Sequence, residues 1–88
     1  MKVRELLSDE SKWCQDWYGR DALGEGAAFD GPAACQWCLM GAIFRCYHDS
    51  RDVVIAVYGK TGRTITDWND DPSRTYAEVK ALVDELDI

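Results

Sequence analysis

The stretch AACQWCLMGAIFRCYH, residues 33–48, holds three of the four cysteines and the only histidine of the chain. Only Gln36, Arg45 and His48 in it are strongly polar, and a helix that is apolar on nearly all sides is usually buried. Gly31-Pro32 precedes it, and proline suits the first helical turn, where its missing N–H is not needed. We therefore predict a buried central helix over about residues 32–48, in which cysteine acts as a small hydrophobic residue.

Within this predicted helix, Gly41 and Ala42 leave a low surface that another element can approach closely. We expect Trp68 to pack against that surface. The bulky side chains of the helix should be largely buried, namely Trp37, Leu39, Ile43 and Phe44.

Four other segments are predicted to be helical. Residues 2–8 form a short helix, and residues 64–68 form a single short turn. Residues 50–58 (SRDVVIAVY) are ambiguous, because their β-branched run favours a strand while Ser50 and Gly59 could begin and end a helix; we favour the helix. The clearest helix follows Thr75, which makes a capping-box pattern with Glu78 ahead of apolar residues spaced three or four apart.

Residues 13–30 carry three glycines, and their apolar pattern changes period too often for a long regular element. We expect an irregular or hairpin-like loop there, whose Trp13 and Trp17 fill part of the core. The predicted fold is mainly α: a compact single domain, residues 1–88, of four to five short helices around the central helix at about 32–48.

Length and charge limit the classes of function. A chain of 88 residues has room for one domain, and 47% hydrophobic residues are enough to build its core. Ten basic against sixteen acidic residues give a net charge of −6, which repels a phosphate backbone, so direct nucleic-acid binding is not expected. No apolar run approaches the roughly 20 residues that cross a bilayer, and the N-terminus lacks the features of a signal peptide. We expect a cytoplasmic protein with reduced thiols.

The cysteines raise the question of a metal or thiol site. In a continuous helix Cys46 would lie roughly 16 Å along the axis from Cys35, whereas thiolates on one zinc ion sit only about 2.3 Å from the metal. That leaves Cys35 and Cys38, which would need a partner such as Cys14, and a lone C-x-x-C is a weak zinc signal. We expect no metal and no cofactor, and we keep a zinc- or thiol-dependent module on Cys14, Cys35 and Cys38 as the alternative.

The acidic run DWNDD, residues 67–71, matches several positions of an EF-hand calcium loop together with Glu78. Pro72, however, stands where that loop needs glycine for a sharp bend. We expect instead that Asn69 and Asp70 hydrogen-bond the turn, while Glu78 closes the capping box. The chain has no Gly-rich phosphate loop and no Ser-His-acid arrangement, so we predict that it is not an enzyme.

Two motifs, W-C-x-x-G-A beginning at Trp37 and W-N-D-x-P-x-R-T beginning at Trp68, resemble signatures of a family of small uncharacterised bacterial and phage proteins. The resemblance extends over most of the chain and is weakest at residues 17–29. It implies a compact, mainly helical domain that is often carried on mobile DNA, and it implies no activity. The residues that we assign to this structural signature are Trp13, Trp37, Cys38, Gly41, Ala42, Trp68, Asn69, Asp70, Thr75 and Glu78.

Small size, acidity and the phage context that the resemblance implies lead to one expectation about function. We expect a non-enzymatic protein that binds another protein, encoded by a phage or mobile element and inhibiting a host system such as a defence complex. An acidic face suits a basic channel on such a target. Neither a membrane nor a nucleic acid is expected as a direct partner, and no oligomeric state is predicted.

Overall fold

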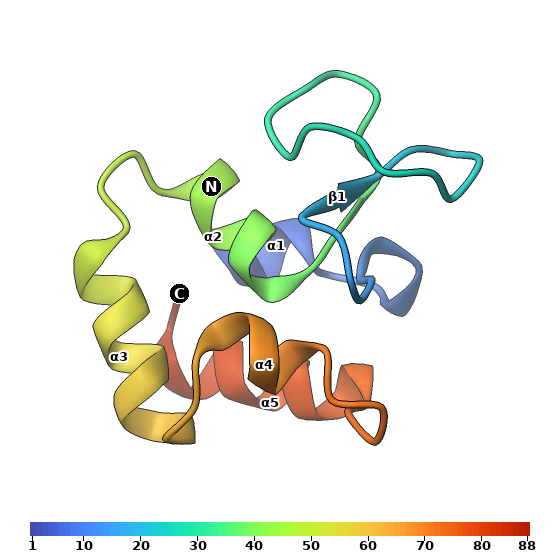
Figure 1. Ribbon diagram of the computed structural model, residues 1–88. Coiled ribbons are helices and arrows are strands. Elements are labelled where there is room, and N and C mark those ends of the chain that lie inside the picture. The colour runs from blue at the N-terminus through green and yellow to red at the C-terminus, as the bar shows by residue number, and fades with distance from the viewer.

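Five α-helices and a two-residue strand pair make up the computed structural model, which describes all 88 residues (Figure 1). In chain order the elements are helix α1 (Val3–Leu6), the 3-10 helix η1 (Glu10–Lys12), strands β1 (Gly19–Arg20) and β2 (Gln36–Trp37), and helices α2 (Leu39–Cys46), α3 (Arg51–Thr61), α4 (Ile65–Asn69) and α5 (Tyr76–Leu86). The domain is therefore compact and mainly helical, as predicted.

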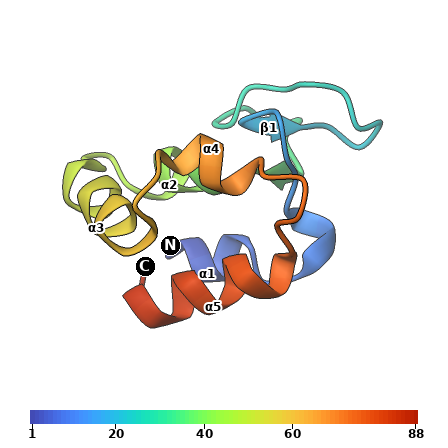
Figure 2. The same cartoon turned by 60° about the horizontal axis from the view of Figure 1, so that its bottom comes forward.

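The helices pack in two layers. Helices α1 and α5 lie side by side below, α2 and α4 lie above, and α3 closes one end against α4 (Figure 2). Each of these helices contributes at least one side chain to the buried core. The core consists of Val3, Leu6, Leu7, Trp37, Leu39, Ala42, Ile43, Val57, Ile65, Trp68, Val79, Leu82, Val83 and Ile88. None of the helices combines the length and the apolar composition that crossing a lipid bilayer requires.

The helices with local start and stop signals are confirmed. Helix α5 begins with a capping box in which the Thr75 hydroxyl accepts from Glu78 N–H and the Glu78 carboxylate accepts from Thr75 N–H. The Thr64 hydroxyl caps α4 by accepting from Asp67 N–H, without the reciprocal bond of a capping box. Residues 51–61 are helical and not a strand, but the helix runs past Gly59 and ends at Gly62, whose φ of 71° is left-handed. Glycine accepts that conformation without the steric cost of a Cβ.

The predicted central helix over residues 32–48 is wrong in its first half. Helix α2 begins only at Leu39, with the Cys38 sulfur accepting a hydrogen bond from Gly41 N–H. Residues 36–37 are a strand that pairs antiparallel with β1, with Trp37 opposite Gly19. The backbone groups of this segment form hydrogen bonds with residues far away in the sequence; for example, Cys14 N–H donates to Trp37 O. These bonds replace the ones that a helix would have supplied.

Three packing predictions are also wrong. Trp68 is buried, but the backbone of Tyr18, not Trp68, lies on Gly41: a Cβ there would sit 1.9 Å from Tyr18 O. Trp17 does not fill the core, because it is 53% exposed, whereas Trp13 is half-buried against the core. Phe44 is only half-buried. The remaining predicted core residues, Trp37, Leu39 and Ile43, are buried.

Candidate functional site

Asn69 is the only polar residue among the buried ones, and all four of its side-chain hydrogen bonds are made. Its Oδ1 accepts from Trp13 Nε1 (2.7 Å) and from Leu39 N–H (3.0 Å). Its Nδ2 donates to Cys14 O (3.2 Å) and to Asp70 Oδ1 (2.9 Å). An amide has two donors and two acceptor lone pairs, so Asn69 has no capacity left for a ligand.

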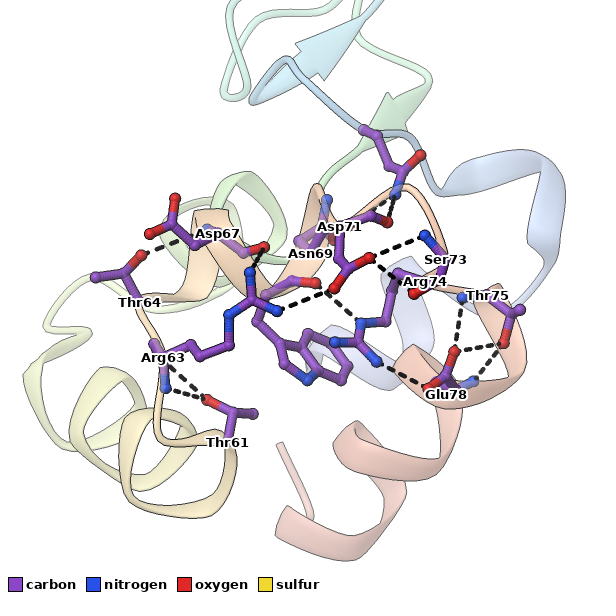
Figure 3. Close-up of polar contacts among 12 residues, drawn as sticks. Thr61, Arg63, Thr64, Asp67, Asn69, Asp71, Ser73, Arg74, Thr75 and Glu78 are labelled. Carbon is purple, nitrogen blue, oxygen red and sulfur yellow. Dashed lines mark hydrogen bonds and ion pairs between the residues drawn. The ribbon is translucent and has the colours of Figure 1, made fainter.

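The polar side chains that follow Asn69 also have hydrogen-bond or ion-pair partners within the protein (Figure 3). The Arg74 guanidinium lies 3.9 Å from the centre of the Trp68 ring, donates to Trp68 O and pairs with Glu78. Asp71 accepts from Ser73 N–H, from the Ser73 hydroxyl and from Arg63, and these bonds lower its pKa from 3.8 to about 2.

The motif from Trp68 to Glu78 is therefore a structural lock that joins α4 to α5. Glu78 closes the capping box as predicted, but Asp71, and not Asn69 or Asp70, accepts the hydrogen bonds within the turn. Asp70 also accepts from Asp16 N–H at 2.9 Å and so ties the loop before β1 to the lock. No three histidine, cysteine, aspartate or glutamate side chains gather closely enough to hold a metal ion, in this run or elsewhere. The calcium pattern in the sequence thus does not become a ligand cluster.

The four cysteines differ in burial. Cys14 and Cys38 are buried and come directly after the paired residues Trp13 and Trp37, whereas Cys35 is exposed. Burial raises the pKa of Cys14 to about 11 and also raises that of Cys38. A thiol with a raised pKa stays protonated at neutral pH, and the thiolate is the form that attacks or binds metal.

Cys38 instead has a structural role as the N-cap of α2, and the Cys14 thiol donates to Trp17 O at 3.6 Å. Cys14 and Cys38 are neighbours, because the residues before them, Trp13 and Trp37, form a parallel bridge. The exposed Cys35 does not join them in a group of three ligands, which the zinc or thiol alternative on Cys14, Cys35 and Cys38 would need.

Two shallow hollows mark the surface. One, of about 280 Å³, lies between α1 and β2 and is lined by Leu6, Trp37 and the exposed Cys35 among others. The other, of about 400 Å³, lies over Trp68 and is bordered by the ion pairs Arg74–Glu78 and Lys60–Glu85. The carboxylates that line the second hollow, Glu78 and Glu85, are both paired with basic side chains of the same hollow.

The most distinctive exposed feature is residues 16–30, here called the arm. The chain between β1 and β2 projects from the helical layers (Figure 1). Trp17, Tyr18 and Leu23 are 53%, 47% and 84% exposed. They account for three of the six large hydrophobic side chains that the molecule exposes; Ile55 and Tyr58 on α3 and Met1 are the others.

Hydrogen bonds hold the tip of the arm in one conformation. Asp21 Oδ1 accepts from Leu23 N–H and Glu25 N–H, and Gly24 N–H donates to Asp21 O. The Arg20 guanidinium donates to Gly24 O (2.6 Å) and to Gln15 O (3.0 Å). Gly24 has a φ of 80°, a left-handed conformation that most other residues adopt only with strain.

The aromatic side chains of the arm also have fixed supports. The Trp17 ring lies directly on Gly26, where a Cβ would come within 2.6 Å of it. Tyr18 packs edge-on against Phe44 of α2, with ring centres 5.9 Å apart. At the base, Arg45 donates to Phe29 O and Gly31 O, so α2 anchors the far end of the arm.

Sequence reasoning missed the arm as a site and assigned its Trp17 to the core. The one local signal was the alternation of aromatic residues with glycine and aspartate in DWYGRDALGEG, residues 16–26. That pattern is typical of a tight turn. The direction in which its aromatic side chains point also depends on Phe44 of α2, which lies outside this stretch of sequence.

Comparison with known proteins adds one match. No curated protein and no solved structure resembles the chain significantly. The model of a family described as "Family of unknown function (DUF6197)" matches residues 1–86. Since the match covers nearly the whole chain, the protein belongs to the family of unknown function DUF6197.

Proposed function

We propose that this protein acts by binding another protein through the arm. The observation that carries the proposal is that Trp17, Tyr18 and Leu23 are exposed on a loop whose conformation is already fixed. Tryptophan and tyrosine are enriched among the residues that dominate binding energy at interfaces. A loop that is ordered before binding loses little conformational entropy when it binds.

The proposal extends to the biological setting. The motifs at Trp37 and Trp68 resemble those of bacterial and phage proteins, and the small acidic domain suits an inhibitor that acts in the host cytoplasm. The target would be a host system such as a defence complex, and the protein would act by occupying a surface and not by catalysis. The lock around Asn69 would hold the helical layers as a rigid base for the arm.

Co-purification from bacterial hosts tests the binding step when it is combined with matched variants. Trp17→Ala with Leu23→Ser removes the apolar tip of the arm, and Ile55→Ser with Tyr58→Ala removes a similar exposed area from α3. We expect mass spectrometry to find a stoichiometric partner that is lost with the arm variant and retained with the α3 variant. A partner retained by both variants, or none across several hosts, would contradict the proposal.

Phage plating tests the inhibitory role. Strains that carry individual defence systems would be infected with and without expression of the protein. We expect at least one system to be relieved by the wild type and by the α3 variant but not by the arm variant. The decisive strains are those whose defence component is the captured partner. If expression of the protein does not change the efficiency of phage plating on them, inhibition is rejected while the binding proposal stands.

A further inference from the structure

The carboxylates of the chain are divided between two regions. Residues 5–30 contain seven of the sixteen carboxylates and only two basic residues, Lys12 and Arg20. None of these seven carboxylates forms an ion pair. Six of the nine carboxylates after residue 30 do, namely Asp49, Asp71, Glu78, Asp84, Glu85 and Asp87.

The two basic residues of this region form no ion pair with its acids, and seven acids against two bases leave the region a net charge of −5. The Arg20 guanidinium donates hydrogen bonds to the carbonyl oxygens of Gly24 and Gln15, and Lys12 Nζ lies 3.5 Å from Ser8 Oγ. The helical layers are different, because Lys2, Arg4, Lys60, Arg63, Arg74 and Lys80 all pair with carboxylates there. The uncompensated negative charge is therefore concentrated on the arm and the chain that leads to it.

Acidic and apolar groups alternate within the arm. Leu23 stands at the tip of a turn between Asp21 and Glu25, and Trp17 directly follows the exposed Asp16. A carboxylate at the edge of an interface is left without a counter-charge unless the partner supplies one. Apolar anchors surrounded by carboxylates thus match a surface that has an apolar pocket surrounded by ammonium or guanidinium groups.

We propose that the partner of the arm is a protein surface rich in lysine and arginine, with an apolar pocket that accepts Leu23 and the edge of Trp17. This inference rests on the proposed protein-binding function and specifies the chemistry of the partner. The carboxylates of Asp21 and Glu25 pair with the basic groups around the pocket. Electrostatic attraction between the two surfaces accelerates their encounter, and dissolved salt weakens it.

Selection from a library of random dodecapeptides tests the inference without knowledge of the natural partner. The intact protein would be immobilised, and the probes would be the synthetic peptides made from the enriched sequences. We expect these peptides to combine lysine or arginine with leucine or an aromatic residue. Their affinity should fall roughly tenfold or more when the salt is raised from about 0.05 M to about 0.5 M.

Charge variants locate the contact. Asp21→Asn with Glu25→Gln removes two charges of the arm, and asparagine keeps the oxygen that accepts from Leu23 N–H. Asp52→Asn with Asp67→Asn removes two unpaired carboxylates outside the arm and changes the net charge equally. We expect the arm variant to weaken peptide binding about three- to tenfold and to flatten its salt dependence, and the control variant to change it less than about twofold.

The outcomes separate the two proposals. Enriched peptides that lack basic residues, or equal weakening by both charge variants, would overturn the cationic partner while leaving protein binding by the arm in place. No enrichment over an empty support, together with a co-purified partner that is insensitive to Trp17→Ala with Leu23→Ser, would overturn the proposed function itself.

Discussion

At the scale of single residues, Asn69 shows how a buried polar side chain can organise a small domain. Its partners Trp13, Cys14 and Leu39 lie 30 to 56 positions away in the sequence. The amide therefore joins the segment after η1, the first residue of α2 and the end of α4. The sequence indicated that Asn69 bonds the turn, but the residue ends α4 and its side chain bonds these distant partners instead, of which the sequence contains no sign.

Replacing Asn69 tests this role. Asn69→Ala would leave the Trp13 indole N–H, the Leu39 N–H and the Cys14 carbonyl without a partner. An unsatisfied buried donor or acceptor costs about 1–3 kcal/mol, so we expect the free energy of unfolding to fall by about 2–4 kcal/mol. Urea titration measures this change.

Asp67→Asn is the control, because that exposed side chain on the same helix accepts no hydrogen bond through its carboxylate in the structure. It should change the stability by no more than about 0.5 kcal/mol. Equal urea midpoints for Asn69→Ala and the control would show that the hydrogen bonds of Asn69 are dispensable.

At the scale of elements, helices defined by local sequence signals could be predicted, whereas segments whose conformation depends on long-range contacts could not. Helices α4 and α5 have Ser/Thr-type caps and apolar spacing within a few residues, and both were predicted. Residues 33–38 are apolar except for Gln36, a pattern that suits a strand as well as a buried helix. Contacts with Arg20, Cys14 and Asn69 decide between the two, and none of these is local.

Close approach at Gly41 was predicted correctly, but the approaching element was not. The prediction rested on the absence of a side chain, which says that space is available and not which segment fills it. The same reason explains why Trp17 was assigned to the core: a large apolar side chain in a loop can pack inward or stay exposed. The candidate site on the arm was therefore beyond what the sequence could indicate.

Two glycines in helices give a matched test of this packing. A Cβ at Gly41 would lie 1.9 Å from Tyr18 O and 2.7 Å from Tyr18 C, whereas a Cβ at Gly59 would meet no atom within 4 Å. Alanine is favoured over glycine in a helix by about 1 kcal/mol, so Gly59→Ala should stabilise by about 0.5–1 kcal/mol. Gly41→Ala should destabilise by about 2 kcal/mol or more, because backbone atoms must move.

Urea midpoints of the two variants check the signs. If Gly41→Ala were as stabilising as Gly59→Ala, the arm would not rest on α2 as described, and the support of Tyr18 by Phe44 would also be in doubt.

At the scale of the whole molecule, the helical layers and the arm differ in charge pairing. Most carboxylates of the helical layers form ion pairs with basic side chains, whereas those of the arm do not. Lys2 and Arg4 pair with Asp87, and Arg4 N–H donates to Ile88 O, so the two ends of the chain are joined. Exposed ion pairs contribute little individually, about 0–1 kcal/mol. Their importance lies in the contrast: seven of the ten carboxylates that form no ion pair lie in residues 5–30, so a partner that supplies positive charge would find most of them there.

The lowered pKa values of several carboxylates predict how the protein responds to acid. Hydrogen bonds from Ser73 N–H, the Ser73 hydroxyl and Arg63 hold the pKa of Asp71 at about 2, below its ordinary 3.8. A hydrogen bond from Thr75 N–H lowers the pKa of Glu78, and one from Lys2 lowers that of Asp87. These carboxylates stay ionised in the folded protein at pH values where the unfolded chain is already protonated.

Between pH 4 and pH 2 the unfolded state therefore binds more protons than the folded state, so the free energy of unfolding falls as the pH falls. The stabilisation is complete above about pH 5, because both states are then ionised. We expect the urea midpoint to be constant between about pH 5 and pH 7 and to drop steeply below about pH 4. Asp71→Asn should have a lower midpoint at neutral pH and a shallower drop in acid. A midpoint that falls equally in the variant would mean that other carboxylates, and not the one that fastens the turn between α4 and α5, control the acid transition.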